Sequence, residues 1–143
     1  MPNPIYKFIN VHYFNSLSKL LKKELGINTD RNTLEKLYKT NNSKSLLAIN
    51  DRKVVGHILV ETKYDIKNDR FYYILSNLII KKEYRKLGIG TTLIKKLEKY
   101  ARKNKIYYLE YNLLNPNKAT INFLHFNHFK KAKNNTFYKN LIK

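Results

Sequence analysis

The 143-residue chain contains no cysteine and no tryptophan, and it has one methionine, three prolines and four glycines. Without cysteine it can form neither a disulfide nor a thiolate metal site, and a covalent acyl-cysteine intermediate is excluded. Its four histidines are scattered without the spacing of zinc ligands, so we expect no metal.

Long apolar segments are also missing. No run approaches about 18 apolar residues, the length that indicates a membrane-spanning helix, and residues 1–7 lack the apolar stretch of a secretory signal. We therefore expect a soluble cytoplasmic protein without membrane association. The hydrophobic content of 43%, with 13% aromatic residues, suits one globular domain over residues 1–143.

Acidic residues are scarce, because 10 Asp and Glu stand against 29 Lys and Arg, a formal net charge of +19. Residues 1–83 carry 15 basic and 8 acidic side chains, whereas residues 84–143 carry 14 and 2. Such a field attracts polyanions, which predicts nucleic acid, an acidic protein or a phosphorylated cofactor as a partner. The alternative is coding bias, since lysine, asparagine, isoleucine and tyrosine are abundant and arginine is limited to five residues.

Hydrophobic periodicity and turn residues predict the order of the elements. A first strand is expected over 4–9, followed by two helices on one face of a sheet. The first helix covers 12–24 with Gly26 as its C-cap, and the second begins after Asp30 and buries Leu34, Leu37 and Tyr38. The remaining expected elements are strands 45–49, 53–60 and 71–80, helix 91–104, strand 106–111, helix 118–126 and a terminal hairpin within 129–142. Because strand 71–80, helix 91–104 and strand 106–111 form a β-α-β unit, the two strands should be parallel.

The most informative segment joins an apolar strand to a helix and reads Arg85-Lys86-Leu87-Gly88-Ile89-Gly90-Thr91. Two glycines remove side chains where a ligand would approach the backbone, and the first N–H groups of a helix have no intrahelical partner. The helix dipole and the charges of Arg85 and Lys86 add positive potential at this end. The segment predicts a phosphate-binding loop, and a tight strand-to-helix turn without a ligand is the alternative.

Several motifs along the chain resemble one family. The Arg-x-x-Gly-x-Gly motif of residues 85–90, the preceding residues 78–84, Leu109-Glu110-Tyr111 and Asn117-x-x-x-Ile121-x-Phe123 resemble the GNAT superfamily of N-acetyltransferases. Lys82 stands where the family commonly has proline. The resemblance implies an α/β fold, α+β by some schemes, with a mixed, mostly antiparallel sheet of about six to seven strands, a central parallel β-α-β unit and helices on both faces.

The resemblance also implies acetyl-CoA as cosubstrate. Its pyrophosphate is expected on the backbone amides of the glycine loop near Arg85, and its pantetheine arm along the backbone of residues 77–80. Asn117 matches a position that contacts the cofactor in many relatives, and capping of the following helix is its alternative role. The residues expected to bind acetyl-CoA are Asn77, Leu78, Ile79, Ile80, Arg85, Lys86, Leu87, Gly88, Ile89, Gly90, Thr91, Asn117 and Leu124.

Acetyl transfer to an amine needs a base for the amine and a proton donor for the leaving thiolate. Glu110 matches the Leu-Glu-Val glutamate that serves as base in some protein N-terminal acetyltransferases of the family; alternatively it is a surface glutamate paired with a lysine. Leu124 stands where the family has a proton-donating tyrosine, and leucine cannot donate a proton. His125 and Tyr138 are the candidate replacements.

The resemblance therefore implies an acetyl-CoA-dependent N-acetyltransferase that acts by direct attack in a ternary complex. The acceptor is a primary amine, either a peptide N-terminus or a small amine. The alternative function is that of a catalytically weak GNAT-fold protein that binds nucleic acid or an acidic partner through its basic surface. A homodimer also stays open.

Overall fold

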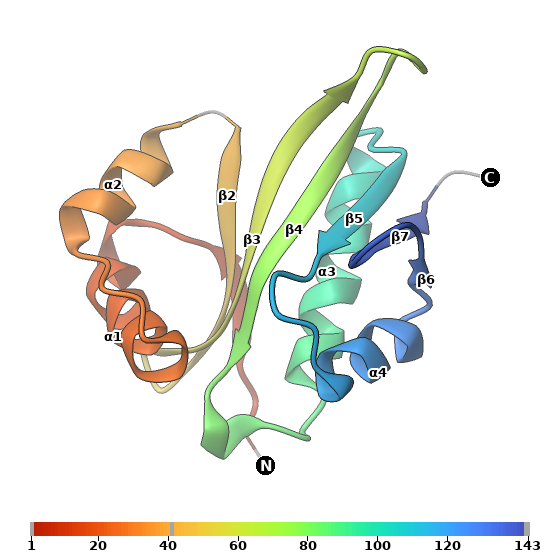
Figure 1. The fold of residues 1–143 in the computed structure, drawn as a ribbon. Helices are drawn as coiled ribbons and strands as arrows, with labels where there is room; N and C mark the ends of the chain where they lie inside the picture. The colour runs from red at the N-terminus through yellow and green to blue at the C-terminus, as the bar shows by residue number, and fades with distance from the viewer. Residues whose placement is uncertain (1, 41, 142–143) are drawn as a thin grey trace.

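A computed structural model describes residues 2–40 and 42–141 of the chain. Within this part the strands form one seven-stranded sheet with the order β1-β2-β3-β4-β5-β7-β6 (Figure 1). The strands are β1 (Ile5–Phe8), β2 (Ser43–Asn50), β3 (Lys53–Asp65), β4 (Arg70–Ile80), β5 (Tyr108–Asn112), β6 (Lys130–Lys131) and β7 (Thr136–Asn140). Only β4 and β5 are parallel among these pairs, which confirms the predicted mixed sheet and its β-α-β unit.

Helices cover both faces of the sheet, as expected. Figure 1 shows α1 and α2 on one side and α3 and α4 on the other. The helices are α1 (Phe14–Leu25), α2 (Arg31–Lys39), α3 (Ile89–Lys103) and α4 (Lys118–Phe126), with short 3-10 turns η1 (Val11–Tyr13) and η2 (Lys82–Tyr84). Gly26 ends α1 in the left-handed conformation, and the Asp30 side chain accepts a hydrogen bond from the Thr33 N–H at 2.8 Å to begin α2.

The structure corrects the prediction for the second helix. Leu34 is buried, but Leu37 and Tyr38 are 42% and 47% exposed, so the expected buried stripe is wrong at two of its three positions. The reason is that α2 lies at the outer side of the molecule (Figure 1), where Tyr38 makes a T-shaped contact with the Phe14 ring at 5.7 Å between centroids. Ile142, the last residue of the expected terminal hairpin, lies outside the described residues.

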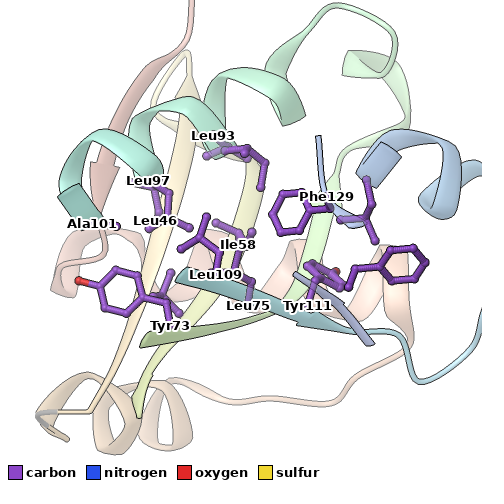
Figure 2. Packing of buried hydrophobic residues seen from close by; sticks show 14 of the residues in the cluster. Leu46, Ile58, Tyr73, Leu75, Leu93, Leu97, Ala101, Leu109, Tyr111 and Phe129 are labelled. Carbon is purple, nitrogen blue, oxygen red and sulfur yellow. The ribbon is translucent and has the colours of Figure 1, made fainter. Parts of the chain in front are cut away.

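Two hydrophobic clusters hold the layers together. The larger one packs α3 and α4 against the sheet, and Figure 2 shows Leu93, Leu97 and Ala101 of α3 facing the side chains of the sheet. The smaller cluster lies under α1 and α2. Each fully buried aliphatic side chain stabilises the fold by about 1.5–3 kcal/mol relative to an exposed one, so these clusters fix the sheet on which the site is built.

A bulge interrupts β4 near its end. Leu75 belongs to the cluster under α3, whereas Ile79 belongs to the cluster under α1, although regular alternation would put residues four apart on the same face. Asn77 adopts a positive φ of 52° between them, and the β3–β4 register shifts between His57 and Leu59. The extra residue reverses the alternation, so Leu78 turns toward the cluster under α3.

Candidate active site

A groove of about 420 Å³ opens where β4 ends and α3 begins. It lies between the C-terminal end of α1, the last residues of β4 and the first turn of α4. Its lining residues are Glu24, Leu25, Leu78, Ile79, Ile80, Arg85, Gly90, Asn117, Ala119, Thr120 and Phe123. The fold thus brings together the end of the strand, the glycine loop and Asn117, which lie in three separate parts of the sequence.

The glycine loop has the geometry of an anion site. Gly88 is the N-cap of α3 at φ 83°, and no side chain caps this helix within the described residues. The N–H groups of Ile89, Gly90 and Thr91 have no acceptor in this part of the chain, so they are available to a phosphate. A Cβ atom at Gly90 would lie only 3.0 Å from Cε1 of Phe123. Glycine at this position therefore allows α4 to pack closely against the loop.

Arg85 is held in place by a carboxylate that the sequence did not point to. Its Nε donates to the Ile80 carbonyl at 2.9 Å, and its Nη2 donates to Oε1 of Glu24 at 3.2 Å. The same carboxylate oxygen accepts from the Lys82 N–H at 2.9 Å. Glu24 therefore fixes the entrance to the loop, while the half-exposed Arg85 guanidinium keeps further N–H groups for a ligand.

The two parallel strands separate beside the groove. Their pairing joins Tyr73–Leu75 to Leu109–Tyr111 and ends there. Beyond it, the Tyr111 hydroxyl accepts a hydrogen bond from the Leu78 N–H at 3.1 Å. The edge of β4 after Leu75 is therefore not paired with β5, as an extended ligand that pairs with a strand edge would require. Tyr111 does not line the groove, but its hydroxyl contacts Leu78, which does, and sequence reasoning missed this contact.

A buried histidine holds the bulge. His57 is 3% exposed, and burial lowers its pKa to about 4, so the imidazole is neutral near pH 7. Its Nδ1 lies 2.9 Å from the Asn77 carbonyl and its Nε2 lies 2.9 Å from Oγ of Ser45. Because a carbonyl only accepts, Nδ1 carries the proton and Ser45 donates to Nε2. The exposed Asn77 thus contributes its backbone to the bulge and does not line the groove.

Glu110 lies on the sheet face opposite Tyr111, directly across from Tyr138 in the β5–β7 pairing. Its Oε2 accepts from Nδ2 of Asn112 at 3.4 Å, and Asn112 in turn accepts from the Thr136 hydroxyl at 2.9 Å. No lysine or arginine of the described residues forms a salt bridge with Glu110. This observation disfavours the alternative of a lysine-paired surface glutamate.

Tyrosines surround Glu110 on this face. The rings of Tyr72 and Tyr108 stack with centroids 4.5 Å apart and planes at 10°. Burial, and secondarily the charge of Glu110, raises the pKa of Tyr72. Burial first, and then the neighbouring Tyr72 and carboxylates, raises the pKa of Tyr108 to about 12. Both phenols stay protonated near neutral pH beside the carboxylate.

Of the other residues predicted for the site, some line the groove and others do not. Asn117 lines the groove and also caps α4, because its side chain accepts from the Thr120 N–H at 2.8 Å. Leu124 is fully buried in the core and is not among the groove-lining residues, so its side chain is turned away from a ligand there. His125 is exposed against the edge of the Phe137 ring, and Tyr138 shares the face of Glu110.

The other residues of the glycine loop differ in how far they are exposed. Lys86, Leu87 and Gly88 are exposed, and Ile89 is 4% exposed with its side chain in the core. Thr91 is half-buried, and its hydroxyl accepts from Nδ2 of Asn127 at 3.4 Å.

The described residues include no group of three or more His, Asp or Glu side chains that could hold a metal. In the same part of the chain, every helix is too short or too polar to cross a membrane.

The chain shares its fold with many solved structures, of which three are described. An acetyltransferase of the GNAT family from Staphylococcus aureus Mu50 has 22% identity and a TM-score of 0.74, covering 96% of this chain and 100% of that one. YhbS from Escherichia coli, a GNAT family N-acetyltransferase in complex with CoA, has 11% identity and a TM-score of 0.79, covering 99% and 83%. NAA60 from Arabidopsis thaliana, in complex with a bisubstrate analogue, has 15% identity and a TM-score of 0.79, covering 96% and 98%.

At sequence identities of 22% or less, these similarities establish the fold alone. No curated protein matches the chain in sequence. The model of the Acetyltransferase (GNAT) family, however, matches residues 14–129, a span that includes the glycine loop, Glu110 and Asn117. The chain therefore belongs to the GNAT acetyltransferase family.

Proposed function

We propose that this protein is an N-acetyltransferase that moves the acetyl group of acetyl-CoA to a primary amine by direct attack in a ternary complex. The observation that carries the proposal is the groove at the end of β4, which joins Arg85, Gly90 and Asn117 beside the free N–H groups of α3. Acetyl-CoA supplies an activated acetyl thioester and two anionic regions that these groups suit.

The residues present fit this cosubstrate. Backbone N–H groups of residues 89–91 and the outer N–H groups of Arg85 would bind the pyrophosphate. The edge of β4 at 78–80, which lines the groove, would lie along the extended pantetheine arm. YhbS, which shares the fold, was solved in complex with CoA.

Glu110 would act as the base. A lysine-type amine has a pKa of about 10.4 and an α-amine one of about 7.7–8.0, so the acceptor must lose a proton before it attacks. Glu110 lies on the half-open face of β5 without a cationic partner in the described part of the chain, and its carboxylate is therefore free to take that proton. The acceptor is a peptide N-terminus or a small amine.

The test combines binding and turnover. Saturating acetyl-CoA should raise the melting temperature, because a ligand at about 100 times its dissociation constant adds about 2.7 kcal/mol of stability. Acetyl transfer should be measured on a panel of peptides and small amines. Glu110→Gln should lower kcat by about 10²–10⁴-fold while the thermal shift with acetyl-CoA is kept.

Glu35→Gln is the control, since Glu35 is a half-buried glutamate of α2, a helix that packs on β2 and does not line the groove. It should leave turnover unchanged. A wild-type protein whose melting temperature does not respond to acetyl-CoA or CoA would contradict the proposed function.

A second cavity favours the alternative function of polyanion binding. It has a volume of about 420 Å³ and lies between α1, the β2–β3 turn and the end of β4. Its cationic lining residues are Lys19, Lys23, Arg52, Lys53 and Lys81. Within the described residues, Lys23 and Lys81 approach Glu83 at 3.9 and 3.7 Å, and the other three cations have no salt bridge. Such a cavity suits a phosphate-bearing polyanion.

A further inference from the structure

Tyr111 is a buried phenol at the point where β4 and β5 separate. It is 5% exposed and belongs to the cluster under α3, and Figure 2 shows it among these side chains together with Leu75 and Phe129. Its oxygen lies 3.1 Å from the backbone nitrogen of Leu78, and Leu78 lines the groove. The hydroxyl is therefore next to the site although most of the ring is in the core.

The Tyr111 hydroxyl makes one hydrogen bond and has no acceptor for its own proton within the described residues. That one hydrogen bond is accepted from the Leu78 N–H. Burial raises the pKa of Tyr111, so the phenol keeps its proton near neutral pH. A desolvated donor without an acceptor costs free energy, and a ligand atom that accepts its proton would remove that cost.

Glu110 and Tyr111 are neighbours in β5, so their side chains point to opposite faces of the sheet. The burial of the two side chains agrees with these opposite directions, because Tyr111 is in the core while Glu110 is half-buried on the other face. A carbonyl carbon between the separated strands would therefore have the base on one side and a proton donor on the other. The proton taken from the amine and the proton given to the sulfur would then be handled by two different groups.

The two proton donors predicted from the sequence, Tyr138 and His125, are less well placed than Tyr111 to protonate the leaving sulfur. Tyr138 lies on the same face as Glu110, directly opposite it in the strand pairing. His125 is exposed on α4 against the Phe137 ring. Leu124, at the position of the family's tyrosine, has no proton to give.

We propose that Tyr111 is the proton donor to the leaving sulfur, an inference that rests on the proposed N-acetyltransferase function. The amine lone pair forms the C–N bond as the C–S bond breaks, and the bond's electron pair goes to sulfur. The Tyr111 hydroxyl gives its proton to that sulfur, which leaves as a thiol. Glu110 takes the proton that the amine loses, and exchange with solvent returns a proton to Tyr111.

The first test removes only the hydroxyl. Tyr111→Phe should lower kcat by about 10²-fold, the lower end of the range for proton transfer, because a thiol is a fair leaving group. Tyr73→Phe is the matched control, since Tyr73 is also 5% exposed, lies in the same cluster and pairs with Leu109 away from the groove. It should keep full turnover. Thermal unfolding of both variants checks that each is folded.

The second test needs no turnover. At about pH 9 a thiol with a pKa of about 8.5 is largely thiolate. Wild-type protein should bind CoA at this pH about 10-fold more tightly than desulfo-CoA. This preference is expected because the Tyr111 hydroxyl would donate a hydrogen bond to the charged sulfur, which desulfo-CoA lacks. Tyr111→Phe should bind the two compounds equally, whereas Tyr73→Phe should keep the preference. Isothermal titration calorimetry gives both dissociation constants.

The outcomes distinguish this inference from the proposed function. An active wild-type enzyme whose Tyr111→Phe variant keeps kcat within about twofold and still prefers CoA would overturn the role of Tyr111 alone. A wild-type protein that binds neither acetyl-CoA nor CoA would overturn both. Loss of turnover together with loss of the CoA preference, in a folded variant, supports Tyr111 as the donor.

Discussion

At the scale of single residues, Gly88 and Gly26 offer a direct comparison. Both have a positive φ, 83° and 68°, and a Cβ atom added at either would meet nothing within 4 Å. Replacing either by alanine therefore introduces only the backbone penalty of the left-handed conformation, about 1 kcal/mol. The two positions differ in function, since Gly88 begins the helix of the anion loop and Gly26 ends α1.

We predict that Gly88→Ala and Gly26→Ala lose similar free energy of unfolding, and that only Gly88→Ala weakens acetyl-CoA binding. The loop in Gly88→Ala relaxes its strain by moving the N–H groups that point at the ligand. Urea denaturation gives the stabilities and calorimetry the dissociation constants. Equal affinities in the two variants would show that the amides of the loop do not hold the pyrophosphate.

The roles of Glu24 and Tyr111 could not be predicted from a local sequence pattern. Glu24 is a helix residue 61 positions from Arg85, and Tyr111 is 33 positions from Leu78. Both look like ordinary helix and strand residues in the sequence. Their roles arise from contacts between distant segments, which no local spacing encodes.

At the scale of elements, the bulge in β4 connects packing to the site. It moves Leu78 toward the groove, and His57 holds it through the Asn77 carbonyl. The pKa of His57 is lowered from 6.5 to about 4 by burial. Between these values the unfolded chain binds a proton that the folded chain does not, so stability must fall as the pH falls.

We predict that the wild-type protein loses up to about 3 kcal/mol of unfolding free energy between about pH 6.5 and about pH 4 through His57, since one pKa unit corresponds to about 1.36 kcal/mol. The contribution is fully present above the unfolded-state pKa and lost as the pH falls through the folded-state value. His57→Gln, whose amide can donate and accept but does not titrate, should lose less stability over this range.

Urea denaturation at several pH values measures the effect. His12→Gln, a substitution of an exposed histidine, controls for the loss of an imidazole. If the slope of stability against pH is the same in His57→Gln as in the wild type, His57 does not carry this linkage.

At the scale of the whole molecule, the charge of +19 has two explanations, polyanion binding and coding bias. They differ in where binding would occur. A functional site would be local, in the cavity lined by Lys19 and Lys53, whereas net charge alone would act over the whole surface.

We predict that the protein binds a short DNA duplex at low salt and that affinity falls with a log–log slope of about −0.9 per phosphate contacted. The double variant Lys19→Gln/Lys53→Gln should flatten this slope. Lys63→Gln/Lys67→Gln, which removes the same charge near the β3–β4 connection, should not. Fluorescence anisotropy at several salt concentrations measures the slopes. Equal loss in both double variants would favour net charge, and absent binding at low salt would eliminate the alternative function.

The sequence by itself determined the order and type of the elements, the parallel β-α-β unit and the glycine loop. These features follow from local physics: apolar spacing, cap residues and the conformational freedom of Gly88. Asn117 as a helix cap belongs to the same group, because its partner Thr120 is three residues away.

The tertiary structure alone decided which of these residues meet. The order of the strands and the bulge at Asn77 place Tyr111 beside Leu78 and bury His57. The same packing buries Leu124 and leaves Leu37 and Tyr38 exposed. Such outcomes depend on which surfaces of distant elements cover one another, and periodicity along one segment carries no information about the neighbour that will cover it.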